Sequence, residues 1–293
     1  MKNLIPIAPY CRVLQITCAT LLFLSCNLFA ASSQVKSRLT DFRHNVHSQY
    51  GEDGIIQKIF QTIDTSSKIC IEFGAWDGFY LSNTANLWSK DSSWKGILIE
   101  CDAPRYNVLV KNTQNFNCIP LHRKVESDGR NTLENILREH SISAQIDLLS
   151  IDIDSDDYYI FESLTTLRPR VIICEFNPTM PAHLDIFPPK NTYLGCSVAA
   201  LKRIATNKGY SLVAITDCNC FFVVNEEFHK FAQFDTDFSS LRIDRYLRYV
   251  ITDYSGNYAV VAGNDFIEPY GLNAPLPHEI NGAVKRQELI KLG

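Results

Sequence analysis

The chain has 293 residues, of which 46% are hydrophobic and 20% are charged, and its formal net charge is -4. That length is enough for one large domain or two small ones, and the composition is typical of a globular protein that buries a core. No run of five or more Lys and Arg residues occurs, so the sequence shows no electrostatic footprint of a nucleic-acid-binding protein.

The first 31 residues form a hydrophobic leader, since the stretch from Val13 to Ala31 is uncharged and mostly apolar. A cleaved secretory signal would end at the small residues near Ala31, whereas an uncleaved anchor needs about 20 apolar residues, which the stretch just reaches. A buried core helix is a third interpretation. Basic residues such as Lys36 follow the leader, so an anchor with its C-terminal side in the cytosol is also compatible with the charges. We therefore expect an exported or membrane-anchored protein with a linker at residues 32–47, and an anchored form would hold its catalytic domain in the cytosol.

After the linker, short apolar runs alternate with stretches of helical periodicity. This alternation predicts βαβ units and an α/β fold, namely a Rossmann-like, doubly wound, mainly parallel seven-stranded sheet that ends in an antiparallel pair. Residues 48–227 would form this domain, and residues 228–293 a C-terminal extension. The expected helices are 51–63, 82–89, 104–114, 132–139, 157–166 and 198–208, and the expected strands are 69–73, 96–100, 117–121, 146–151, 171–176, 210–215 and 220–224.

The strongest chemical signal is the segment Glu72–Gly78, EFGAWDG, which begins at the end of the first expected strand. Gly lets the chain turn sharply out of a sheet and lets the backbone approach a ligand without an intervening Cβ. An acid at the strand end can accept hydrogen bonds from the ammonium group of S-adenosylmethionine (SAM), a group that dinucleotides lack. Trp76 stands where the dinucleotide pattern Gly-x-Gly-x-x-Gly needs its middle glycine. The alternative is an ordinary Gly-rich loop.

A second acid, Glu100, ends the next expected strand, 28 residues after Glu72. One βαβ step after a glycine loop, an acid in this place can bind both hydroxyls of a ribose. The alternative is a capping or solvent-facing glutamate.

Several acids follow the fourth expected strand, in the segment Asp147–Asp157, DLLSIDIDSDD. The strand would deliver Asp152 and Asp154 to the carboxyl edge of the sheet, where α/β folds bind ligands. Like charges this close repel, so a cation, hydrogen-bond donors or solvent must offset them. The alternative is that Asp154 and Asp156 cap the helix that follows.

Oxygen-bearing side chains also end the fifth expected strand, at Glu175 and Asn177. Together with Asp152 and Asp154 they form a candidate metal site, because Mg²⁺ prefers oxygen ligands. The alternative for Asn177 is turn chemistry before Pro178. No histidine has a motif position that marks it as a catalytic base, and His122 and His183 are the candidates.

Taken together, these segments resemble the FkbM-type branch of SAM-dependent methyltransferases. The resemblance also uses Ser48–Gly54, SQYGEDG, and covers residues 48–224, about 60% of the chain. It implies a class I methyltransferase fold and O-methylation of a glycan or small hydroxylated acceptor. It also implies that Glu72, Gly74, Ala75 and Gly78 hold the methionine part of SAM, that Glu100 holds the ribose, and that Asp152 and Asp154 are catalytic.

Two alternatives to a methyltransferase remain open at this point. One is a non-catalytic module that binds SAM or a nucleotide, which an exported protein would favour because SAM is made in the cytosol. The other is a metal-dependent nucleotide-sugar enzyme that uses Asp152 and Asp154. The expected partners are a small-molecule or glycan acceptor and, through the leader, a membrane, but no nucleic acid.

Overall fold

The chain divides into two compact units, residues 1–36 and 37–293, and the second carries the fold. The leader lies outside the described residues, so its predicted role as a signal or anchor stays a prediction. Among the described residues, no helix is both long and apolar enough to cross a membrane. The computed structural model describes residues 36–142, 145–252, 254, 257–262 and 284–285.

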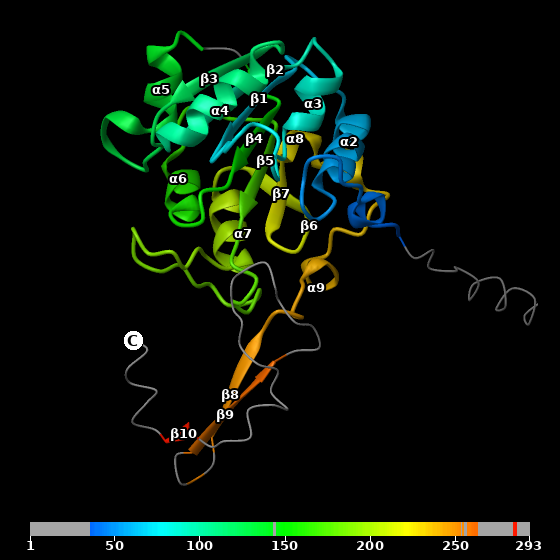
Figure 1. Cartoon of the computed structure of the whole chain (residues 1–293). Helices are drawn as coiled ribbons and strands as arrows, with labels where there is room; N and C mark the ends of the chain where they lie inside the picture. The colour runs from blue at the N-terminus through cyan, green and yellow to red at the C-terminus, as the bar shows by residue number, and fades with distance from the viewer. Residues whose placement is uncertain (1–35, 143–144, 253, 255–256, 263–283, 286–293) are drawn as a thin grey trace, which may run out of the picture. The chain divides into compact units, whose positions relative to one another are not determined.

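A seven-stranded sheet forms the centre of the second unit, with the strand order β3-β2-β1-β4-β5-β7-β6 (Figure 1). The strands β3, β2, β1, β4 and β5 pair in parallel, whereas β7 is antiparallel to both β5 and β6. The chain builds outward from β1 to β3 and then crosses to β4, so the topological switch point lies between β1 and β4. The strands are β1 (Ile69–Phe73), β2 (Lys95–Glu100), β3 (Cys118–His122), β4 (Leu148–Ile151), β5 (Val171–Glu175), β6 (Tyr210–Ile215) and β7 (Asn219–Val224).

Helices cover both faces of this sheet. On one face α5, α6 and α7 pack against side chains such as Phe73 and Ile151, and on the other α2, α3 and α4 pack against side chains such as Cys70 and Leu148. Successive strand residues point to opposite faces, and because both faces are covered the central strands are almost wholly apolar. The helices are α2 (Glu52–Ile63), α3 (Ala85–Lys90), α4 (Ala103–Thr113), α5 (Leu133–Glu139), α6 (Asp157–Ser163) and α7 (Val198–Asn207).

The predicted fold class is confirmed: the protein has a Rossmann-like, doubly wound, mainly parallel seven-stranded sheet. β1 and β6 have the predicted bounds, and the other strands and helices differ at their ends by a few residues. The start of α3 differs for a physical reason. It begins at Ala85 and not at Ser82, because Ser82, Asn83 and Thr84 donate hydrogen bonds to the Glu72 carboxylate.

Segments on both sides of the predicted domain, residues 48–227, contribute to the core. Within the predicted linker, the 3₁₀ helix η1 (Leu39–Phe42) buries Leu39 completely against α2. After residue 227, Phe231, Phe234 and Leu241 are buried in the same two hydrophobic clusters. After α8 (Asn225–Phe228), Phe231 ends η3 (His229–Phe231) and Leu241 ends α9 (Phe238–Leu241), and Phe234 lies between these two elements.

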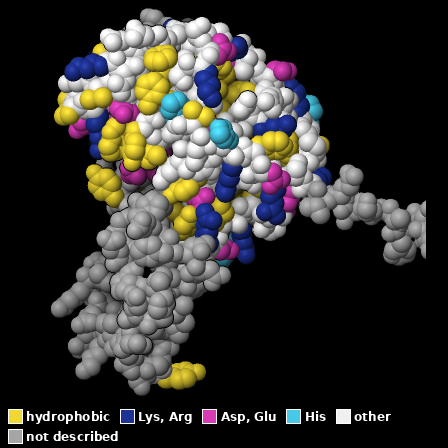
Figure 2. All heavy atoms as spheres, turned by 45° about the vertical axis from the view of Figure 1, so that its right-hand side comes forward, with side chains coloured by type: hydrophobic (Ala, Val, Ile, Leu, Met, Phe, Trp, Pro, Cys, Tyr) yellow, Lys and Arg dark blue, Asp and Glu magenta, His cyan; other side chains and the backbone are white. Residues whose placement is uncertain are grey.

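The rest of the predicted C-terminal extension contains a second, three-stranded sheet in the order β10-β9-β8. Its strands are β8 (Arg248–Thr252), β9 (Asn257–Ala262) and β10 (Val284–Lys285), and they pair antiparallel. On the described part of the face drawn in Figure 2, acidic and basic side chains are interspersed.

Candidate functional site

A cavity of about 410 Å³ opens at the carboxyl edge of the parallel strands. We call it the carboxyl-edge cavity. Its volume is in the range of small-molecule sites, and the edge beside a topological switch point is where open α/β sheets bind ligands. It brings together most of the predicted site residues: Glu72, Gly74, Ala75, Glu100, Asp152, Asp154 and Glu175.

Glu72, the residue before the end of β1, anchors the chain that leads into α3. Its carboxylate accepts hydrogen bonds from the Ser82 hydroxyl at 2.5 Å, the Asn83 N–H at 2.8 Å and the Thr84 hydroxyl at 2.7 Å. Burial raises the pKa of this carboxyl, and the hydrogen bonds from Ser82, Thr84 and Asn83 oppose that rise. Glu72 therefore shapes the cavity wall as well as facing the cavity.

Glu100 links the end of β2 to the loop after β1. Its Oε2 accepts the Trp76 N–H at 2.9 Å and its Oε1 accepts the Asp102 N–H at 2.7 Å. The Ala75 N–H donates to the Ile99 carbonyl at 3.1 Å, which fixes the same loop to β2. Each carboxylate oxygen keeps a second acceptor position, so Glu100 can receive two ligand hydroxyls while it holds the loop.

The two glycines of this loop both serve packing against neighbouring elements, and Gly74 also makes the predicted turn and lines the cavity. Gly74 has φ +74°, and a Cβ there would lie 2.0 Å from the Asp152 carbonyl oxygen, so the glycine allows the β1 loop to contact the β4 loop. Gly78 has φ +91°, and its Cβ would meet Leu109 of α4 at 2.9 Å. Gly78 is buried and does not line the carboxyl-edge cavity, so the structure gives it no direct contact with a ligand there.

Asp152, Asp154 and Glu175 form a carboxylate cluster. Each offers an oxygen, and these oxygens all lie within 4.8 Å of one another. Burial raises the pKa of Asp152 well above its ordinary value, and the neighbouring charges of Asp157 and Asp154 raise it further. Burial also raises the pKa of Glu175 well above its ordinary value, with the charge of Asp152 as the next cause. This cluster can act as a proton acceptor or as a set of oxygen ligands for a cation.

Asp157 shapes the loop that carries Asp152 and Asp154. Its carboxylate accepts the N–H groups of Ile153 at 2.9 Å and Ser155 at 3.0 Å, and Asp154 between them has φ +61°. Burial raises the pKa of Asp157 to about 6. The capping alternative fails for Asp156, which stands at the N-cap of α6 but accepts the N–H of Asn191 at 2.8 Å.

The side-chain oxygen of Asn177 is used by its own turn, contrary to its predicted role as a metal ligand. Its Oδ1 accepts the N–H of Thr179 at 2.9 Å and the Thr179 hydroxyl at 2.6 Å, and its Nδ2 donates to the Leu194 carbonyl at 2.8 Å. The reason is local, because a short amide side chain before a proline hydrogen-bonds its own turn. The turn alternative is therefore the correct one for Asn177.

Two further residues of the cavity were missed by the sequence analysis. Asn219, the first residue of β7, is the cross-strand partner of Glu175, and Gln49 comes from the loop before α2. The loop of Gln49 is held by Asp53, whose Oδ2 accepts the Ser48 N–H at 2.9 Å and two preceding backbone N–H groups. The segment Ser48–Gly54 was a visible signal for Gln49, whereas Asn219 could be found only from strand register.

Exposed aromatic side chains surround the mouth of the cavity. Trp76 is 41% exposed, Tyr80 57% and Tyr193 88%, and all three line the carboxyl-edge cavity. The Arg105 guanidinium lies 3.5 Å from the centre of the Trp76 ring, a stacking arrangement. Such surfaces can hold a ring of a ligand by stacking.

The candidate histidines lie elsewhere. His122 is exposed, stacks on Tyr106 with 4.8 Å between ring centres, and lies 3.1 Å from the Cys101 carbonyl through Nε2. His183 is exposed in the chain between β5 and α7. No described histidine lines the carboxyl-edge cavity, so an imidazole base is not available there from the described residues, whereas five carboxylates are.

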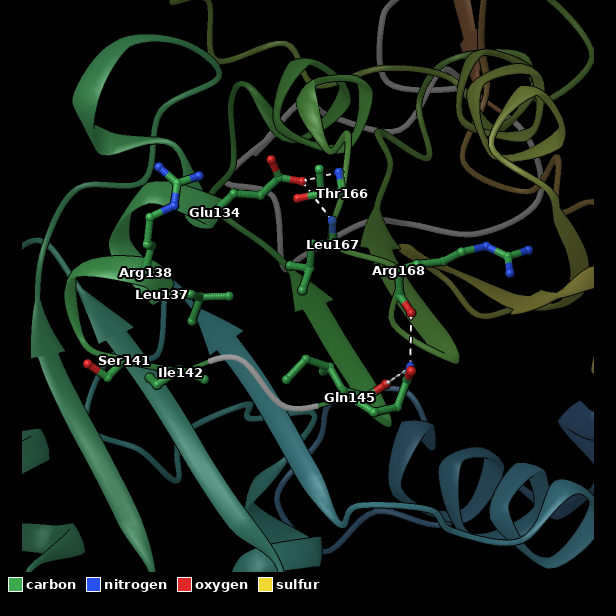
Figure 3. Close-up of a pocket in the computed structure, with 10 residues that line it drawn as sticks. Glu134, Leu137, Arg138, Ser141, Ile142, Gln145, Thr166, Leu167 and Arg168 are labelled. Carbon is green, nitrogen blue, oxygen red and sulfur yellow. Dashed lines mark hydrogen bonds between the residues drawn. The ribbon is translucent and has the colours of Figure 1, made fainter.

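A second cavity, of about 510 Å³, lies at the amino edge of β4 and β5 (Figure 3). Its polar lining is already engaged in hydrogen bonds: Glu134 accepts the N–H groups of Thr166 and Leu167, and Gln145 donates to the Arg168 carbonyl. None of the predicted site residues lines it. The carboxyl-edge cavity is therefore the candidate site.

No family model matches the chain, and no curated protein matches it. Solved structures that match include a putative O-methyltransferase from Klebsiella pneumoniae, with 13% identity, 68% of this chain and 94% of that chain covered and a TM-score of 0.41. The N-terminal domain of EvdMO1, solved with SAH and D-fucose, has 8% identity, 59% and 82% coverage and a TM-score of 0.38. A SAM-dependent methyltransferase from Aquifex aeolicus has 14% identity, 57% and 89% coverage and a TM-score of 0.34. These sequence identities and TM-scores are too low to bear on function. The fold assignment follows from the strand order and pairing of this chain.

Proposed function

We propose that this protein is a SAM-dependent methyltransferase of the FkbM-type branch that O-methylates a glycan or small hydroxylated acceptor. The observation that carries the proposal is the carboxyl-edge cavity, in which the loop Gly74–Trp76 and the ribose candidate Glu100 meet beside the switch point of the sheet. Glu100 would accept hydrogen bonds from the ribose hydroxyls, and the aromatic mouth would hold rings of the cofactor or the acceptor.

The charge of the cavity favours SAM over an anionic nucleotide. Five carboxylates line it, those of Glu72, Glu100, Asp152, Asp154 and Glu175, and they outnumber the three basic side chains of Arg105, Arg123 and Lys124. SAM carries an ammonium and a sulfonium charge that suit this acidic excess. A diphosphate would be repelled by the same carboxylates. This is the physical argument against a nucleotide-sugar enzyme.

The acceptor hydroxyl would lose its proton to the carboxylate cluster. Asp152 lies at the β1–β4 switch point, and a carboxyl with a raised pKa is a better proton acceptor at neutral pH than an ordinary one. Methyl transfer needs an in-line approach, so much of the rate would come from positioning. Asp154 would share this role, either beside Asp152 as a second acceptor or as a ligand of a bound cation such as Mg²⁺.

The proposal is tested by titrating the full chain with SAM and with S-adenosylhomocysteine in a calorimeter. We expect Glu100→Gln to weaken both ligands by on the order of 1.5–3 kcal/mol, since both carry the same ribose and lose a charge-assisted hydrogen bond. Gln offers one oxygen to the two backbone N–H groups of Trp76 and Asp102, so circular dichroism and thermal unfolding must show that the variant is folded before its affinities are compared.

The matched control is Glu226→Gln, an α8 carboxylate that pairs with Arg168 and does not line the cavity. It should leave both affinities unchanged. The methyltransferase proposal fails if wild-type protein binds no SAM, and tight binding of a nucleotide sugar in its place would support the nucleotide-sugar alternative.

For the leader we propose an uncleaved anchor that keeps the domain in the cytosol, where SAM is made. The intact mass of the protein isolated from membranes should then include residues 1–31, and the domain should resist protease added to the outside of cells. A mature protein that begins near Ala31 would contradict this proposal.

A further inference from the structure

We infer that Asp152, Asp154, Glu175 and Asn219 form a binding site for a hard divalent cation of the Mg²⁺ or Ca²⁺ class within the carboxyl-edge cavity. The role of that cation in catalysis rests on the proposed function, whereas its binding does not. The site differs from the predicted metal set in one ligand, because Asn219 takes the place of Asn177.

The three carboxylates converge from two neighbouring strands. Asp152 and Asp154 follow β4, Glu175 ends β5, and their nearest oxygens lie within 4.8 Å of one another. β4 and β5 are in parallel register through Ile151 and Cys174, so the residues that follow these two emerge side by side. Oxygen ligands in this number, with room in a cavity for water and substrate, suit Mg²⁺ or Ca²⁺.

The cluster has no cationic partner within the described part of the chain. None of the ion pairs formed there includes Asp152, Asp154 or Glu175. Three basic side chains line the same cavity, but Arg123 and Lys124 pair with Glu139 and Glu126. The third, Arg105, stacks on the Trp76 ring. Three converging carboxylates with no basic partner are costly, and a bound cation would remove that cost.

Asn219 supplies an independent observation that points to a ligand. The residue is 3% exposed, and its Oδ1 is buried without a hydrogen-bond donor among the described residues. Its Nδ2 faces Glu52 Oε1 and Cys218 Sγ, both at 3.4 Å, which assigns the other side-chain atom as the oxygen.

The register of the sheet brings this oxygen to the cluster. Asn219 and Glu175 are directly opposite one another on antiparallel strands, so their side chains lie on the same face of the sheet, and both line the carboxyl-edge cavity. A buried carbonyl oxygen that lacks a donor is satisfied by a cation, and asparagine oxygens are ordinary ligands of hard cations.

The competing account is that Asp152 and Glu175 share a proton and Asn219 stays unsatisfied. Only the cation-site account expects the protein to bind a divalent cation, so direct measurement of cation binding separates the two. We would strip the full chain with EDTA, desalt it, and follow the loss of the free Mn²⁺ signal by electron paramagnetic resonance as Mn²⁺ is added, with Mg²⁺ as competitor.

We expect one Mn²⁺ per chain, displaced by excess Mg²⁺, and affinities lowered about tenfold or more in Asp152→Asn and Asn219→Leu. Asn219→Asp keeps an oxygen in place and should retain binding, which keeps the test informative if Asn219→Leu does not fold. The matched control is Asp156→Asn, because Asp156 belongs to the same acidic segment but accepts the N–H of Asn191; it should bind Mn²⁺ like the wild type.

The inference is overturned if wild-type protein binds no Mn²⁺, or if Asp156→Asn weakens binding as much as Asp152→Asn. A parallel titration with SAM in EDTA separates this failure from failure of the proposed function. SAM binding without Mn²⁺ binding would reject the cation site and retain the methyltransferase proposal. Mn²⁺ binding without SAM binding would reject the methyltransferase proposal and retain the cation site.

Discussion

Each end of β4 carries an aspartate, and the surroundings of the two differ sharply. Asp147, at the amino end, is fully buried and accepts the N–H groups of Ser66, Ser67 and Lys68 at 2.8–3.2 Å. It also pairs with Arg170 at 2.9 Å. Its negative charge is therefore fully compensated by the protein itself.

Asp152, at the carboxyl end, is half-buried and faces Asp154 and Glu175. Among the described residues, no hydrogen bond or ion pair to its carboxylate compensates the charge, and its pKa is raised by burial and by the neighbouring acids Asp157 and Asp154. Burial of this kind is unfavourable unless something binds there.

The difference separates structural acids from candidate functional ones. A sheet edge that holds the fold together surrounds its acids with donors, and Glu134 near the amino edge follows the same pattern as Asp147. At the carboxyl edge Glu72 and Glu100 are also held by donors, whereas the cluster of Asp152, Asp154 and Glu175 has no ion pair among the described residues. Stability is given up for function at such a cluster.

The same substitution at the two ends should have opposite effects on stability, and the larger effect is at Asp147. Asp147→Asn removes the charge opposite Arg170 and turns an N–H₂ group toward buried donors, so we expect a loss of about 3–5 kcal/mol in the free energy of unfolding. Urea unfolding followed by circular dichroism measures this loss. A loss below about 1 kcal/mol would show that the buried network around Asp147 is not a structural anchor.

The sheet could be predicted because its signal is local. The apolar runs of β1 and β6 have the predicted bounds, since a strand buried on both faces is marked by its own residues. The carboxylates Asp152, Asp154 and Glu175 could be brought together for the same reason, because parallel strands present their carboxyl ends at one edge.

The partners of these acids could not be predicted, because they come from distant parts of the chain. The donors to Asp147 lie 79–81 residues away, and the opposition of Asn219 and Glu175 depends on the register of β7 against β5. The space beside Gly74 is taken by the Asp152 carbonyl, a contact that exists only when the loops after β1 and β4 are both in place. The sequence therefore provided candidate residues for a site, but not which of them the fold already uses.

Asp152→Asn, the matched change at the other end of β4, should raise the free energy of unfolding by about 1 kcal/mol in EDTA, because it removes one of several crowded carboxylates. Added Mg²⁺ should stabilise the wild type increasingly as its concentration exceeds the dissociation constant, and it should stabilise the variant less at every concentration. Thermal unfolding with and without Mg²⁺ measures both effects. If Asp152→Asn destabilised the protein in EDTA as much as Asp147→Asn does, the two ends of β4 would not differ.

The smallest expected effect is at Glu134 and extends the comparison to pH. Burial alone would raise the pKa of this carboxyl, but the N–H groups of Leu167, Thr166 and Thr165 outweigh it and lower the pKa to about 2. Because the folded-state pKa lies below the ordinary value of 4.5, its contribution to stability is present above that value and is lost as the pH falls toward 2. We expect Glu134→Gln to cost about 1 kcal/mol near neutral pH, a modest value because the residue is only partly buried and solvent screens its charge. The gap between wild type and variant should narrow as the pH falls below the ordinary value, which urea unfolding at a series of pH values measures. A gap that stays constant over this range would mean that the charge of Glu134 has no part in holding the loop before β5.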